Sequence, residues 1–230
     1  MATRSHPSTT GWTSASSTDP STGSGHRLNA TQQRRWVFKP IVWILCLLPL
    51  ALLIYDGFTD NLTANPIEKI TNTTGIWTLR LIVASLLVTP LRWATGINQL
   101  INYRRVIGLF AFFYGSIHFT VFFFLDHQFD FGAMWTDVLK RPYIAAGFAA
   151  FVLMIPLAIT STTGWIRRMG GRKWNLLHKL IYITALAAVL HYYLKVKLDG
   201  SYPVYYGIGV AFLLGFRAWR YFAKPAASEV

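Results

Sequence analysis

The chain has 230 residues, of which 53% are hydrophobic and 13% are charged, and its formal net charge is +13. Soluble domains carry about 25% charged residues, so this composition argues against a soluble globular protein. Nucleic-acid binding would need basic residues gathered on one polar face. Here they stand in short clusters between apolar runs, which is typical of a multi-span membrane protein.

Residues 1–33 are rich in Ser, Thr and Gly and poor in apolar side chains. Such a segment cannot bury enough surface to offset the entropy lost on ordering, so we expect a disordered N-terminal extension. The basic cluster at 34–39 resembles a twin-arginine export signal. Because a long apolar run follows it without a small-residue cleavage site, we interpret this cluster as the basic flank of a start-transfer helix.

Six apolar runs follow, each close to the ~20 residues that cross ~30 Å of hydrocarbon as a helix. They cover residues 36–55, 76–94, 106–125, 143–161, 175–194 and 203–222. Helices satisfy their own backbone groups in lipid, and the alternating pattern of a membrane barrel is missing. We therefore predict an all-α membrane protein, a six-transmembrane helix bundle over 34–222 with a short tail at 223–230.

The charges flanking these runs alternate along the chain. Arg and Lys predominate before the first run, in 92–105, in 167–173 and after the last run. The acidic residues gather in the alternate loops, within 56–69, 126–141 and 195–199. By the positive-inside rule, both termini are expected in the cytoplasm.

Three histidines, His118, His178 and His191, lie within the runs. Ionisable side chains inside a membrane are costly and are usually functional. With a rise of ~1.5 Å per residue, His118 lies ~20 Å and His191 ~25 Å from the cytoplasmic ends of their helices. Two neutral imidazoles at similar depth are suited to bis-histidine ligation of a haem iron. Such ligation favours electron transfer because no coordination position stays open.

His178 does not fit the same pair. It lies ~6 Å from the cytoplasmic end, and on an ideal helix it points ~220° away from His191. It could ligate a second, inner haem, contact a flavin or quinone, or cap the helix. His127, just beyond the third run, is interpreted as a surface histidine. Cys46 is the single cysteine, so a disulfide within the chain and a C-x-x-C-H site for covalent haem are both excluded.

Basic residues supply two further candidate contacts. Arg80, near the outer end of the second run, could pair with a haem propionate or extend to lipid headgroups. The tight basic loop at 167–173 could hold a flavin phosphate, because its glycines allow a backbone nest, or it could carry topogenic charge alone. The residues proposed for the phosphate are Arg167, Arg168, Gly170, Gly171 and Arg172. No G-x-G-x-x-G motif occurs, so we expect electrons from a membrane quinol or a separate flavoprotein.

The histidines, together with several local stretches, resemble the ferric-reductase-like transmembrane superfamily. The stretches are Asn65-Pro66, Gly75, Thr89-Pro90-Leu91-Arg92, Arg104-Arg105-Val106-Ile107-Gly108-Leu109, Arg141-Pro142-Tyr143, Leu157-Ala158-Ile159-Thr160-Ser161 and Trp174 through Leu177-His178. Within the superfamily, residues 40–222 are most similar to the haem-binding membrane subunits of bacterial systems that reduce protein methionine sulfoxide.

This resemblance implies haem b, with His118, His191 and His178 as iron ligands, and also FMN. It implies a multi-pass protein of the bacterial inner membrane that transfers electrons and is not itself the catalytic subunit. The electrons would pass from the quinone pool, or from a cytosolic flavin reductase, to a periplasmic molybdopterin reductase, MsrP, that repairs oxidised periplasmic proteins as a heterodimer with this subunit. NADPH-oxidase-like relatives have two histidines on the third span and a fused flavin domain, and this chain has neither.

Two other functions, a transporter or channel and an intramembrane hydrolase, are compatible with histidines in membrane spans. A transporter or channel with a histidine proton relay would be expected to show discontinuous helices and an internal repeat. We find no such repeat, and the runs lack carboxylates. An intramembrane serine hydrolase using Ser116 or Ser85 would need a G-x-S-x-G elbow, which Gly115-Ser116-Ile117-His118 does not supply.

Overall fold

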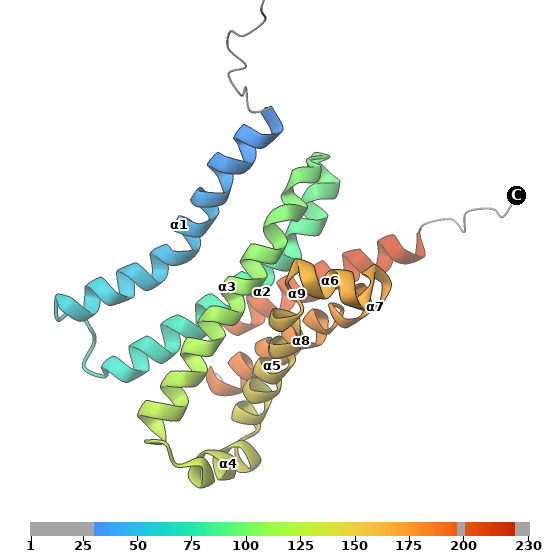
Figure 1. Ribbon diagram of the computed structural model, residues 1–230. Helices are drawn as coiled ribbons and strands as arrows, with labels where there is room; N and C mark the ends of the chain where they lie inside the picture. Colours follow the sequence, from blue (N-terminus) through green and yellow to red (C-terminus); the bar gives the residue numbers. More distant parts are fainter. Residues whose placement is uncertain (1–29, 197–200, 224–230) are drawn as a thin grey trace, which may run out of the picture.

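A computed structural model describes residues 30–196 and 201–223, which are helical almost throughout (Figure 1). The long helices are α1 (Ala30–Phe58), α2 (Pro66–Thr95), α3 (Ile101–Val121), α5 (Pro142–Ile159), α8 (Leu180–Val196) and α9 (Ser201–Phe222). The short helices are α4 (Phe131–Lys140), α6 (Thr163–Met169) and α7 (Gly171–Leu177). Residues 1–29 of the predicted disordered extension and 224–230 of the predicted tail lie outside the described residues.

Five helical segments are long and apolar enough to cross a membrane. They are Lys39–Phe58, Pro66–Thr95, Asn98–Asp126, Pro142–Ile159 and Gly171–Val196. Large apolar side chains such as Leu52, Leu87 and Leu186 stay exposed on them, as expected for a surface that contacts lipid. Helix α9 has 22 residues but is not among the five. The all-α membrane class is thus confirmed, while the sixth span and the position of the termini stay predictions.

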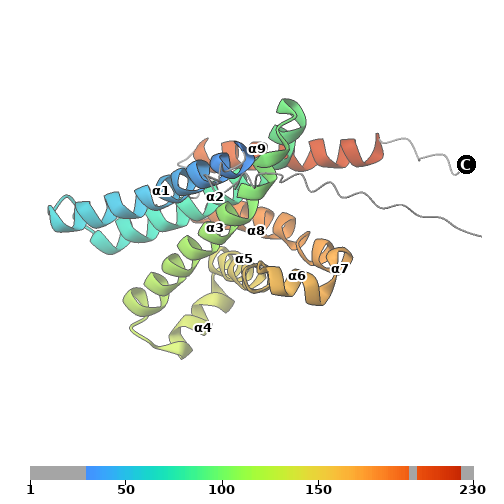
Figure 2. The same ribbon diagram turned by 45° about the horizontal axis from the view of Figure 1, so that its top comes forward.

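The bundle is built from two antiparallel helix pairs and two outer helices (Figures 1 and 2). Helix α2 packs along α3, and α5 packs along α8. Helix α9 packs against α8 and α2, and α1 lies at the edge against α2 and α3. The core where these elements meet includes Ile82, Leu86, Tyr114, Ala185 and Val210, all of them almost completely buried.

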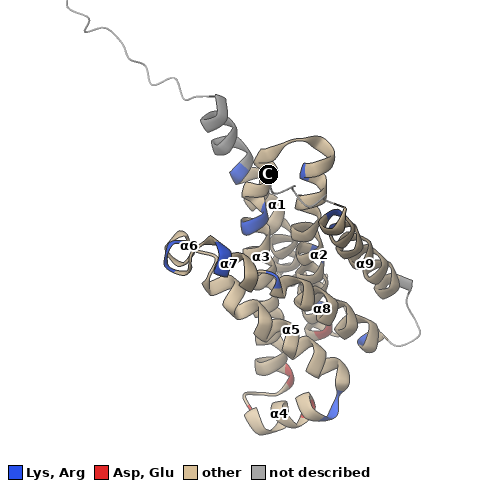
Figure 3. Cartoon of the chain, turned by 90° about the vertical axis from the view of Figure 1, so that its right-hand side faces the viewer, with Lys and Arg blue, Asp and Glu red and all other residues tan. Residues whose placement is uncertain are grey.

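The two ends of the bundle differ in charge (Figure 3). The acidic residues of the described part all lie in 56–68 and 126–137, at the end that carries α4. The stretches at the opposite end, 92–105 and 163–173, hold only basic charged residues. We call these the acidic end and the basic end.

Side-chain bonds hold the edge helix α1 on the bundle. Pro49 has no N–H and interrupts the hydrogen-bond ladder of α1. Next to it, the Leu50 N–H donates to the Tyr114 hydroxyl (3.0 Å), and this hydroxyl donates to the Cys46 carbonyl (2.8 Å). The hydroxyl of α3 is thus inserted into a helix turn of α1, a recognised origin of helix kinks.

Two predicted loops contain helices, and one predicted helix is interrupted. Helix α4 lies within the predicted loop 126–141, where the Asp130 side chain accepts from the Ala133 N–H (2.9 Å) and caps it. Helix α6 lies within the predicted loop 162–174, whereas α7 begins in this loop and ends at Leu177, inside the predicted run 175–194. The run 175–194 breaks at His178, where the Lys179 N–H donates to the Leu176 carbonyl three residues back (3.1 Å), a tighter turn than an α-helix has.

Replacing Tyr114 with Phe should loosen α1. The change removes two hydrogen bonds between α1 and α3, each worth about 0.5–1.5 kcal/mol, and Leu50 can recover part of this by bonding Cys46 directly. We expect the free energy of unfolding in detergent to fall by about 1–2 kcal/mol, measured by denaturant titration. The exposed Tyr205 changed to Phe is the control, and an equal loss in both variants would contradict the proposed role of the hydroxyl.

Candidate functional site

The centre of the site is a pair of histidines from two different helices. His118 of α3 and His191 of α8 have ring centroids 6.0 Å apart, with the ring planes at 77°. These are the two residues that the depth estimate pairs. No group of three or more His, Cys, Asp or Glu that could hold a metal ion occurs among the described residues. The pair could therefore complete a metal site only if a cofactor supplied the remaining ligands.

Each of the two imidazoles is oriented by a backbone carbonyl of a neighbouring helix. Nδ1 of His118 lies 2.9 Å from the Thr71 carbonyl oxygen of α2, and Nδ1 of His191 lies 2.6 Å from the Tyr143 carbonyl oxygen of α5. A carbonyl oxygen only accepts, so each Nδ1 carries the proton and each Nε2 keeps its lone pair. Metal-ligating histidines are commonly fixed by the same kind of bond.

A glycine makes room for each ring. Gly75 and Gly147 stand four residues after the anchoring carbonyls, on the same helix face. A Cβ at Gly75 would lie 3.0 Å from Cε1 of His118, and one at Gly147 would lie 2.6 Å from Nδ1 of His191. Our sequence reasoning missed Gly147, although its spacing from Tyr143 repeats the spacing of Gly75 from Thr71.

The spacing of the two rings suits one metal ion between them. Metal–imidazole bonds are about 2 Å long, so two rings on opposite sides of one ion have centres on the order of 6 Å apart. The observed separation is 6.0 Å. The residues present therefore fit a haem iron with two axial histidines, in which the porphyrin nitrogens would complete the coordination.

Lys195 is the cation associated with this pair. It follows His191 by one helix turn on the same face, and its amine donates to the side chain of Asn72 on α2. Asn72 is the residue after Thr71, whose carbonyl orients His118. Sequence reasoning had counted it only as a loop charge. Arg80, the predicted propionate partner, is exposed. It donates to the Tyr206 hydroxyl of α9 (3.1 Å) and lies over the Trp77 ring (4.8 Å).

His178 lies at the break between α7 and α8, 13 residues before His191. Its ring stacks on Trp174 with centroids 3.8 Å apart, and its Nδ1 lies 3.1 Å from the Trp174 carbonyl oxygen. Its Nε2 is 3.5 Å from the Ser161 hydroxyl, a distance too long for a strong hydrogen bond. The structure does not bring His178 to the histidine pair, and its role as an iron ligand stays a prediction.

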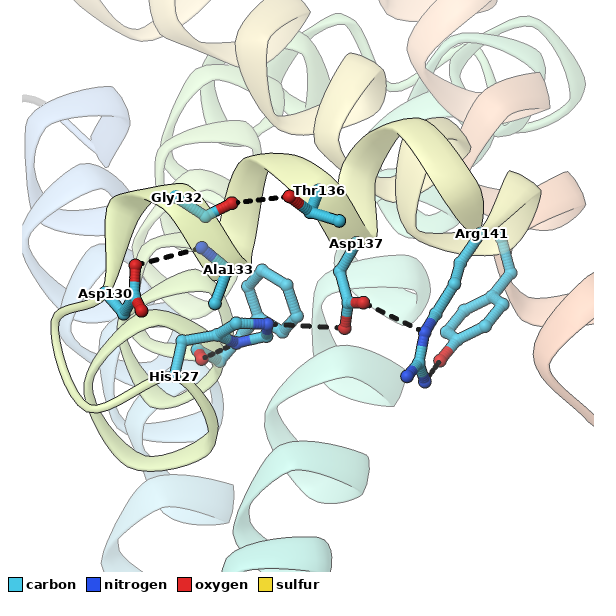
Figure 4. Close-up of polar contacts among 9 residues, drawn as sticks. His127, Asp130, Gly132, Ala133, Thr136, Asp137 and Arg141 are labelled. Atoms are coloured by element: carbon cyan, nitrogen blue, oxygen red, sulfur yellow. Dashed lines mark hydrogen bonds and ion pairs between the residues drawn. The ribbon is translucent and has the colours of Figure 1, made fainter.

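The interpretation of His127 as a surface histidine is wrong. Its side chain is 9% exposed, with Nδ1 3.1 Å from the Phe122 carbonyl oxygen and Nε2 3.3 Å from Asp137 (Figure 4). Asp137 also pairs with Arg141 (3.2 Å), which donates to the Tyr143 hydroxyl (3.4 Å). The Tyr143 hydroxyl and the Asp137 carboxylate raise the pKa of Arg141. The α4 segment is thereby connected to the residue whose carbonyl orients His191.

The residues predicted to bind a flavin phosphate lie on α6 and α7 at the basic end. Arg167, Arg168 and Arg172 are exposed, and Arg168 lies over the Trp165 ring (5.8 Å). Gly170 separates the two helices with a φ of 74°, and its N–H already donates to the Ile166 carbonyl (3.1 Å). Gly171 begins α7. The flavin role of these residues stays a prediction.

Comparison with known proteins gives a consistent result. The family described as ferric reductase like transmembrane component matches residues 74–189. The chain is 48% identical to the protein-methionine-sulfoxide reductase heme-binding subunit MsrQ of Herminiimonas arsenicoxydans, over 83% of this chain and 90% of that protein. It is 48% identical to that of Ralstonia nicotianae (77% and 83%) and 42% identical to that of Caulobacter vibrioides (78% and 86%). No solved structure matches the chain.

The glycine opposite His191 provides a test of this geometry. Gly147→Ala would place a methyl group against the imidazole, and such overpacking typically costs about 1–3 kcal/mol. We expect the haem-to-protein ratio of the purified protein to fall several-fold. Gly108→Ala on α3, where an added Cβ meets nothing within 4 Å, should keep the ratio. Equal ratios in the two variants would mean that the ring does not need this close approach.

Proposed function

The chain belongs to the MsrQ family of ferric-reductase-like transmembrane proteins, and we propose that it is the haem-binding electron-transfer subunit of a protein-methionine-sulfoxide reductase system. The observation that carries this proposal is the His118–His191 pair, 6.0 Å apart with both Nδ1 atoms bonded to carbonyls. Both Nε2 lone pairs are then free to ligate one iron. A proton relay would have to break these anchoring bonds, so the geometry favours ligation over the transporter alternative.

The group that fits is haem b. When bound, it would supply a reversible one-electron carrier, and ligation by both His118 and His191 would leave no position open for oxygen chemistry. These two histidines would hold the group, and the Thr71 and Tyr143 carbonyls would orient them. Phe119, the residue after His118, stacks on Phe151 of α5 with centroids 4.7 Å apart, so the helices that carry and orient the pair are also joined by an apolar contact.

Lys195 and Arg80 are the proposed partners of the haem propionates. Lys195 is favoured because it stands one helix turn after His191 and bonds Asn72, the residue after Thr71, whose carbonyl orients His118. Arg80 donates to the hydroxyl of Tyr206, whose ring is 6.1 Å from that of Tyr192, the residue after His191. It could therefore contribute from the α9 side.

The orientation and the partners follow as further parts of the proposal. Six spans, with α9 as the sixth and both termini in the cytoplasm, would place the basic end inside a bacterial inner membrane and the acidic end outside. The histidine pair would then lie near the periplasmic exit, where a molybdopterin reductase, MsrP, would take the electrons. The donor would be a membrane quinol or a cytosolic flavin reductase, with FMN as an inner cofactor.

Single histidine variants test the ligand assignment. In His118→Ala and His191→Ala, one axial ligand is lost, and we expect the b-type absorbance to disappear or to become that of a five-coordinate haem. Tyr205→Phe, at an exposed position, should keep the spectrum and serves as the control. His178→Ala tests the predicted third ligand: a lower haem-to-protein ratio would support that role, and an unchanged ratio would contradict it. The measurement is the haem-to-protein ratio with reduced-minus-oxidised spectra in mild detergent. A well-folded wild-type protein without haem absorbance would overturn the proposed function.

Removing the Lys195 charge should change the haem potential in a predictable direction. A nearby cation stabilises the reduced, more negative state, so Lys195→Gln should lower the midpoint potential by on the order of tens of millivolts. Lys69→Gln, which removes a cation paired with Asp56 (2.8 Å), should leave the potential nearly unchanged. Potentiometric titration of the haem absorbance measures both. A higher potential in Lys195→Gln would exclude Lys195 as a propionate partner.

A further inference from the structure

The basic end of the bundle contains an arginine whose position is fixed by a proline. Pro90 lies inside α2 and has no N–H to donate to the Leu86 carbonyl four residues earlier. Nη2 of Arg217, on α9, supplies that bond. Because Leu86 is completely buried, the guanidinium is held between the helices and does not extend toward the lipid surface.

A second nitrogen of this guanidinium has no hydrogen-bond partner. Nη1 of Arg217 is buried without a hydrogen bond, and so is the hydroxyl oxygen of Thr89. They are the two such side-chain atoms found in the described part of the chain. Thr89 follows Leu86 by one turn of α2, so it lies on the same helix face. Buried polar groups are nearly always hydrogen-bonded, and two unpaired donors together call for an acceptor.

No acidic side chain neutralises the charge of Arg217 in the described part of the chain. The ion pairs there are Lys69–Asp56, His127–Asp137 and Arg141–Asp137, and the acids stand at the opposite end. The guanidinium of Arg217 lies over the Tyr182 ring of α8 (5.4 Å). A guanidinium within a bundle and without a carboxylate favours a bound anion.

We propose that Arg217 and Thr89 form a binding site for a phosphate group at the basic end of the bundle, between α2 and α9. A guanidinium nitrogen and a hydroxyl, both without a hydrogen-bond partner, are donors of the kind that bind phosphate oxygens. Charge-assisted hydrogen bonds to phosphate are the strong ones. Arginine is favoured for such contacts because its guanidinium stays charged when buried.

The phosphate could come from a flavin mononucleotide or from the headgroup of an anionic phospholipid. The flavin source rests on the proposed function, whereas the site itself does not. The stretch 167–172, which sequence analysis offered for a flavin phosphate, has exposed arginines instead. Binding there would depend on Arg168, whereas binding at the site proposed here would depend on Arg217.

The test uses the full-length protein in detergent with two probes. One arm titrates FMN against riboflavin, which lacks the phosphate, by fluorescence. The other arm measures retained phosphatidylglycerol by native mass spectrometry. In the arm that reports binding, Arg217→Gln should weaken binding by about tenfold or more, and Thr89→Val by about threefold. Thr89→Val keeps the Arg217–Leu86 bond, so it remains informative if Arg217→Gln does not fold.

Arg220→Gln is the matched control, because Arg220 stands one turn further on α9, is exposed and lies over Trp93 (5.0 Å). It should leave binding within about twofold of the wild type. A preference for FMN over riboflavin that disappears in Arg217→Gln identifies the flavin source, and loss of bound phosphatidylglycerol identifies the lipid source. The proposal is overturned if Arg217→Gln and Arg220→Gln behave alike, if Arg168→Gln alone abolishes binding, or if neither probe depends on Arg217.

Haem content, measured in the same samples, separates this site from the proposed function. Phosphate binding that depends on Arg217 in a protein without haem would uphold the site and overturn the proposed function. Protein that carries haem, but whose phosphate binding does not depend on Arg217, would uphold the proposed function and overturn the site.

Discussion

The arrangement of this bundle depends on side chains that donate hydrogen bonds to backbone carbonyls of neighbouring helices. Such bonds run from His118 to Thr71, from His191 to Tyr143, from Arg217 to Leu86, from Tyr114 to Cys46 and from Trp174 to Thr160. Between them they join α3 to α2, α8 to α5, α9 to α2, α3 to α1 and α7 to the end of α5. Apolar contact alone drives helix association only weakly in lipid, so these directional bonds also fix the rotation of each helix.

The same device, used twice, builds the histidine pair. In α2–α3 and in α5–α8, a carbonyl accepts from the imidazole and a glycine one turn further lets the ring approach. Each half fixes its own histidine, and both select the tautomer that leaves Nε2 free. A ligand pair assembled in this way is already oriented before a cofactor enters. Its two rings need little rearrangement on binding, as a site for rapid electron transfer requires.

The sequence predicted the apolar runs and the depth match of His118 with His191, because length, hydropathy and helical rise depend on local order. It could not predict which carbonyl anchors each ring, since that depends on how α2 meets α3 and how α5 meets α8. The stretch of α4 looked like a loop because it is only 10 residues long and carries both Asp137 and Lys140. Gly147, Lys195 and Arg217 were missed for a related reason. The role of a glycine or of a single cation cannot be inferred until the residues opposite it on the neighbouring helix are known.

The two ends of the bundle differ in how firmly they are built, and this difference fits a direction of electron flow. At the acidic end, the pair is held by two carbonyl bonds, and α4 is joined to Tyr143 through Arg141. At the basic end, the helix breaks at His178, whose Nε2 has only a distant hydroxyl as neighbour, and Arg217 keeps an unused donor. If the pair ligates a haem iron as proposed, its fixed geometry would set one potential for transfer to an acceptor. The basic end, with its unsatisfied hydrogen-bond donors and its broken helix, would instead suit an electron donor that binds and leaves.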